Sequence, residues 1–190
     1  DLGALTPPTR WTVVRTYLHL GYTHILPKGL DHILFVGGIF LLSTRITPML
    51  AQVTTFTVAH TITLALTIYG VLSLPSSVVE PLIALSIAYV AIENIVTSQL
   101  RPWRIVLVFT FGLLHGMGFA GVLRELGLPR SEFVPALMSF NLGVEGGQIT
   151  VIAAMFLALG WVRHTSWYRS VAVVPLSVAI AGVGLYWAVP

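Results

Sequence analysis

The chain of 190 residues has no cysteine and few charged residues. Without cysteine there are no disulfides, thiolate ligands or cysteine nucleophile, so a metal would have to be held by imidazole, carboxylate, amide or thioether groups. Only 9% of the residues are charged and 56% are hydrophobic, and the mean hydropathy is +0.89. We therefore expect an integral membrane protein with no sizeable soluble domain, whose first partner is the lipid bilayer.

Internal repeats, low-complexity segments and long linkers are also missing from the sequence. The net charge of +3 comes mainly from arginines near the ends of apolar segments. That placement is typical of a protein oriented in a membrane, so nucleic acid is excluded as a partner. The chain begins at Asp1 without a recognisable targeting signal, and we expect a processed or excised piece of a longer protein.

Apolar runs separated by proline, glycine and arginine predict an all-α integral membrane protein, a bundle of about six transmembrane helices. The predicted spans cover about 27–42, 49–69, 78–97, 103–123, 133–162 and 169–189. Before them, residues 11–22 place Trp11 and Leu18 on one helical face and Arg15 on another, as in an amphipathic surface helix. The predicted domains are an extracytoplasmic lead with this interfacial helix (1–26) and the six-helix transmembrane domain (27–190).

Arginines in the predicted loops indicate the orientation of the chain. The loops after spans one, three and five carry Arg45, Arg101, Arg104, Arg163 and Arg169, whereas the loop after span two has neither lysine nor arginine. Positive charge favours the cytoplasmic side, so these three loops are expected inside and the amino terminus outside.

Ionisable side chains within the predicted spans need an explanation, because each costs about 2.5 to 3.5 kcal/mol at a helix centre. At about 1.5 Å per residue from the outer side, His32, His60, His115 and Asn141 all lie roughly 10 to 18 Å deep, with Glu145 slightly deeper. We predict that His32, His60, His115 and Glu145 hold a metal ion. Asp31, next to His32, is expected to orient an imidazole or to complement the helix dipole.

Further polar residues accompany this layer, and two of them, Glu93 and Gln148, lie one or two turns further in. Asn141, Glu145 and Gln148 form an i, i+4, i+7 stripe on one helix, and Glu93 and Asn94 are adjacent on another. Glu93 and Gln148 are interpreted as a second station on the same path. The alternative is that these groups join helices by hydrogen bonds, or that Glu93 reaches the interface by snorkelling.

Three imidazoles and a carboxylate suit nickel, zinc, cobalt or copper better than magnesium or calcium, which prefer oxygen ligands. Protons compete with a metal for imidazole nitrogens, so affinity should fall as the pH is lowered.

Five ordered blocks of the sequence carry a family resemblance. The segments GYTHILPKGLDHILFV, FTVAHTITLAL, VVEPLIALSIAYVAIEN, FGLLHGMGFAGVL and FNLGVEGGQ resemble the HupE/UreJ family of bacterial membrane proteins, named for hydrogenase and urease accessory loci. The resemblance implies a nickel or related metal permease of the bacterial inner membrane, whose histidine and Asp-His motif is carried by His24, Asp31 and His32. It also implies an extracytoplasmic domain or a metal-delivery partner.

Three functions are compatible with these residues. The first is metal transport past the two polar layers, which requires sites weak enough to release the ion. The second is an intramembrane zinc-dependent hydrolase acting on a lipid or a membrane peptide, with Glu145 or Glu93 as general base. The third is a structural or accessory protein whose polar groups pair with one another.

Overall fold

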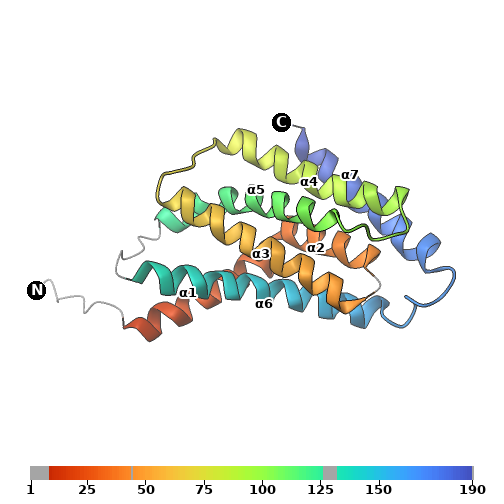
Figure 1. The fold of residues 1–190 in the computed structure, drawn as a ribbon, viewed down its shortest axis with the longest axis horizontal. Helices are drawn as coiled ribbons and strands as arrows, with labels where there is room; N and C mark the ends of the chain where they lie inside the picture. Colours follow the sequence, from red (N-terminus) through yellow and green to blue (C-terminus); the bar gives the residue numbers. More distant parts are fainter. Residues whose placement is uncertain (1–8, 44, 126–131, 190) are drawn as a thin grey trace, which may run out of the picture.

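The computed structural model describes residues 9–43, 45–125 and 132–189, and all regular structure in these ranges is helical. The helices are α1 (Arg10–Ile25), α2 (Leu30–Leu42), α3 (Ile46–Ile68), α4 (Ser76–Val96), α5 (Arg104–Glu125), α6 (Phe133–Leu159), the short π-helix η2 (Arg169–Val173) and α7 (Val174–Ala188). They lie roughly side by side along the long axis of the molecule (Figure 1). The all-α prediction is confirmed.

Several helices are long and apolar enough to cross a membrane. Among the described residues, α3, α4, α6 and the continuous helix Arg169–Ala188 meet this condition individually. The pair α1 and α2, bent by 69°, meets it only as one broken span, and the apolar part of α5, Arg104–Gly118, is shorter. The chain is thus a multi-pass membrane protein, and its described residues contain four or five such spans, close to the six predicted.

Helix α1 corresponds to the helix predicted over 11–22, and one of its faces packs against α6. Gly147 of α6 leaves room for this contact, because a β-carbon there would lie 2.7 Å from the Cβ of Ile25. On the other face Trp11 and Leu18 are exposed. The bend follows at the cis Leu26–Pro27 peptide, near the predicted boundary at residue 26. The separate lead over 1–26 stays a prediction, and its residues 1–8 lie outside the described ranges.

The remaining helices pair around α2. Helix α3 packs along α5, α4 packs along α7, and α2 contacts α3, α4, α6 and α7. Nine of the thirteen residues of α2 are buried, and they include His32. The short α2 therefore places an imidazole where several longer helices meet.

Candidate metal centre

Three histidines from three different helices converge in the bundle. His24 lies in the last turn of α1, His32 in the first turn of α2, and His60 near the middle of α3. Each offers one ligand atom, and these atoms all lie within 4.8 Å of one another. His32 and His60 are buried and His24 is partly buried. We call these three residues the histidine cluster.

His115 of α5 adjoins the histidine cluster. Its ring centroid lies 5.0 Å from that of His32, which in turn lies 5.9 Å from the ring of His60. His115 is 1% exposed. The structure thus brings together the three imidazoles whose similar depth the sequence predicted, and it adds His24, which the family resemblance indicated.

Hydrogen bonds select the tautomers of His60 and His115. Nδ1 of His60 lies 3.0 Å from Oδ1 of Asn141, whose own amide nitrogen donates to the carbonyl of Leu137. Nδ1 of His115 lies 2.9 Å from the carbonyl oxygen of Phe111. Because both partners are acceptors, each Nδ1 carries the proton and each Nε2 keeps its lone pair. This is the arrangement of metal-binding histidines whose second nitrogen is held by a neighbouring oxygen.

Asp31 lies beside His32, as the sequence predicted. Its Oδ1 is 3.1 Å from Nδ1 of His32, and its side chain is 32% exposed whereas that of His32 is 2% exposed. The Nε2 atoms of His32, His60 and His115 are buried and have no hydrogen-bond partner among the described residues. Buried polar atoms are normally paired, and these three nitrogens have lone pairs that can coordinate a metal ion.

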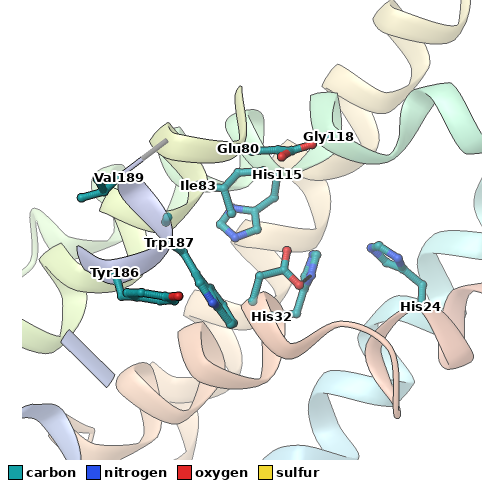
Figure 2. Close-up of a pocket in the computed structure, with 11 residues that line it drawn as sticks. His24, His32, Glu80, Ile83, His115, Gly118, Tyr186, Trp187 and Val189 are labelled. Atoms are coloured by element: carbon teal, nitrogen blue, oxygen red, sulfur yellow. Dashed lines mark ion pairs between the residues drawn. The ribbon is translucent and has the colours of Figure 1, made fainter. Parts of the chain in front are cut away.

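A pocket of about 860 Å³ reaches the histidines between α2, α4, α5 and α7. Figure 2 shows His32 between His115 and His24, with Trp187 and Tyr186 to the left of them. Glu80, Tyr186 and Trp187 also line this pocket, and sequence reasoning did not assign them to the site. The sequence position of Glu80 could have indicated this, because Glu80 lies near the outer end of its predicted span, as Asp31 does.

Aromatic rings close the opposite side of the histidines. The ring of Phe56 lies 5.6 Å from that of His32, 6.1 Å from that of His60 and 4.9 Å from that of His115. Phe35 lies 5.3 Å from His115 and 5.1 Å from Phe56. Both phenylalanines are 1% exposed. The imidazoles are thus approached from the pocket and backed by an apolar layer.

Two residues of the predicted stripe on α6 do not join the histidine cluster. Glu145 is partly buried, and its Oε1 accepts a hydrogen bond of 2.6 Å from Thr54. Gln148 is buried and accepts one from Thr57. Depth along the membrane fixes the height of a residue but not the direction in which its helix turns it. We therefore leave Glu145 out of the ligand set, whereas Asn141 supports His60.

Glu93 and Asn94 belong to a separate polar network around Arg104. The guanidinium of Arg104 lies 2.7 Å from Oε2 of Glu93, and it also donates to Asn94. Arg104 is 1% exposed. Arg104 was expected in a cytoplasmic loop, but it begins α5 and its side chain points into the bundle.

A comparison with known protein families identifies the family of the chain. A family model described as HupE / UreJ protein matches residues 4–190, nearly the whole chain. No curated protein matches the chain, and no solved structure does.

Proposed function

The chain belongs to the HupE/UreJ family, and from that premise we propose that it transports a divalent transition-metal ion, nickel or a similar one, through the histidine cluster. A role in membrane metal transport fits the family. The observation that carries the proposal is the convergence of His24, His32 and His60, from three helices, to within 4.8 Å. Neutral imidazoles bind nickel, zinc, cobalt and copper, and the pattern does not select one of them.

The surroundings of the histidine cluster support entry of a cation from the pocket. The carboxylates of Asp31 and Glu80 line the pocket, and carboxylates attract a cation toward the buried imidazoles. His24, His32 and His115 also line the pocket, and His60 lies one ring further in, at 5.9 Å from His32. An ion that enters past Asp31 would reach the pocket-lining imidazoles first and then the nitrogen of His60.

The intramembrane zinc hydrolase keeps one supporting observation. A pocket of about 860 Å³ beside the histidines is large enough for an organic substrate. However, both carboxylates considered as general base have other partners, since Glu145 accepts from Thr54 and Glu93 pairs with Arg104. The transporter is therefore the better supported of the two.

Metal analysis of the purified protein tests the histidine cluster. We expect the wild type to retain Ni²⁺ or Zn²⁺ and the His32→Ala/His60→Ala variant to lose it. The matched control is His19→Ala/His164→Ala, because both of these histidines are exposed. Equal metal retention by the wild type and the cluster variant would contradict the proposed site.

Flux measurements then separate transport from catalysis. Wild-type protein in proteoliposomes should carry Ni²⁺ inward, and the cluster variant should not. A wild type that binds metal at the histidine cluster but passes none across the bilayer would exclude transport and favour the hydrolase.

The proposed location is the bacterial inner membrane, with the amino terminus outside. The chain lacks cysteine, so single cysteines can report on the orientation. Ser73, between α3 and α4, and Ser98, between α4 and α5, are both exposed. In intact cells, a membrane-impermeant maleimide should label Ser73→Cys and not Ser98→Cys, and the reverse pattern would invert the topology.

A further inference from the structure

The buried guanidinium of Arg104 is surrounded by oxygen atoms from three other helices. Besides its 2.7 Å contact with Glu93, it donates to Oδ1 of Asn94 at 3.2 Å and to Oε1 of Gln52 at 3.1 Å. It also donates to the carbonyl of Gly38 at 3.4 Å. One carboxylate, two amide oxygens and one backbone carbonyl therefore already face a single positive charge.

A second pocket reaches this group from the opposite end of the bundle. It has a volume of about 370 Å³ and is lined by Tyr89, Ile92, Glu93, Val96, Thr97, Arg101 and Trp103. Glu93 thus contacts both the guanidinium and the pocket. Along α4, roughly 20 Å separates Glu93 from Glu80, which lines the pocket at the histidines.

An apolar layer separates the Arg104 network from the histidine cluster. On α5, Val108 and Phe111 lie between Arg104 and His115, which are roughly 16 Å apart along the axis. On α2 and α3 the corresponding positions are filled by Phe35 and Phe56. The ring of Phe111 lies 6.1 Å from that of Phe35. Two polar centres thus stand at different depths with apolar side chains between them.

We propose that the oxygens of Glu93, Asn94 and Gln52 form a second divalent-cation site, in which Arg104 stands as a tethered substitute for the ion. This inference deepens the proposed function and rests on it. In the present state the guanidinium neutralises Glu93 and closes the path. When an ion arrives from the histidine cluster, it replaces the guanidinium at the carboxylate, and the pocket beside Glu93 gives it an exit.

The donor types at the two centres suit capture at the histidines and release at the second site. Imidazole nitrogens bind nickel, zinc and copper more strongly than neutral oxygens do. The second site has one carboxylate and otherwise neutral oxygens, and the guanidinium of Arg104 competes with the ion for these oxygens. A site of this kind holds a transition-metal ion weakly, as release requires.

Replacing Arg104 by a neutral residue tests the second site directly. In Arg104→Gln the carboxylate of Glu93 loses its counter-ion, and we expect the full-length protein to bind an additional equivalent of Mn²⁺, counted by electron paramagnetic resonance. The matched control is Arg104→Gln/Glu93→Gln, which has nearly the same volume but no carboxylate. It should return to the wild-type count. A folded Arg104→Gln variant with no additional Mn²⁺ overturns the inference.

A second variant covers the case in which Arg104→Gln does not fold. Glu93→Gln keeps an oxygen acceptor for the guanidinium and removes only the charge. We expect Ni²⁺ flux into proteoliposomes to fall by about tenfold or more, while Ni²⁺ retention at the histidine cluster is unchanged. Undiminished flux would show that the Glu93–Arg104 pair is only structural. If wild-type protein retains no metal at the histidine cluster, the proposed function itself has failed.

Discussion

The contact between α3 and α5 leaves no room for a side chain at Gly112. A β-carbon added there would lie 2.6 Å from the carbonyl oxygen of Phe56 and 2.9 Å from Cβ of Ala59. Carbon contacts are most favourable at about 3.5 to 4.0 Å, so Gly112→Ala should push the two helices apart by roughly 1 Å. These helices carry His60 and His115, so metal binding should weaken together with stability.

The size of the effect follows from two opposing contributions. Overpacking a close contact costs about 1 to 3 kcal/mol, and replacing a helical glycine by alanine recovers about 0.5 to 1 kcal/mol. We expect Gly112→Ala to lower the free energy of unfolding by up to about 2.5 kcal/mol. Gly182 of α7 provides the matched control, because nothing lies within 4 Å of its added β-carbon. Gly182→Ala should therefore be neutral or stabilising by up to about 1 kcal/mol.

Unfolding in detergent micelles, followed by circular dichroism, measures both variants, and Ni²⁺ titration measures the effect on the site. The decisive quantity is the difference between the two alanine variants, because the chemical change is the same in each. Equal stability of Gly112→Ala and Gly182→Ala would refute the close contact between α3 and α5.

Three further predictions concern side chains around the two polar centres. Asn141→Leu removes the acceptor that fixes the tautomer of His60, so Ni²⁺ affinity measured by calorimetry should fall by about 10- to 100-fold; unchanged affinity would contradict that role. Glu145→Gln should leave metal retention unchanged, because its contact with Thr54 lies outside the histidine cluster; lost metal would restore Glu145 as a ligand. Arg169 donates three hydrogen bonds to carbonyls at the end of α4, so Arg169→Ala should lower the free energy of unfolding by about 1 to 3 kcal/mol, with partial recovery in Arg169→Lys.

The depth of the site along the helices was easier to predict from the sequence than the identity of the residues that form it. Counting residues from the outer side placed His32, His60 and His115 in one layer, and their rings do meet. Asp31 and His32 are also in contact, and the interpretation of Asp31 as a carboxylate that orients an imidazole stays a prediction. The proximity of these residues could be predicted because the rise of a helix is nearly constant and an ionisable group in lipid needs a partner.

The rotation of each helix about its own axis could not be predicted from the sequence. Glu145 follows Asn141 by one turn, yet Asn141 contacts His60 while Glu145 contacts Thr54. Small differences in how α6 packs on α1 and α3 decide which residue faces the histidines. His24 was recovered only by resemblance, since it stands at the end of α1, before the bend that turns the chain into α2.

Arg104 shows how one residue type can serve two purposes at a helix start. An arginine next to a tryptophan at the beginning of a span is typical of the membrane interface, and only the structure shows that this one is 1% exposed. Breaking a buried ion pair by removing one partner is strongly unfavourable. The carboxylate of Glu93 therefore requires another cation when the guanidinium of Arg104 moves away. A divalent ion meets that need, and the proposed exchange couples arrival of the ion to opening of the path.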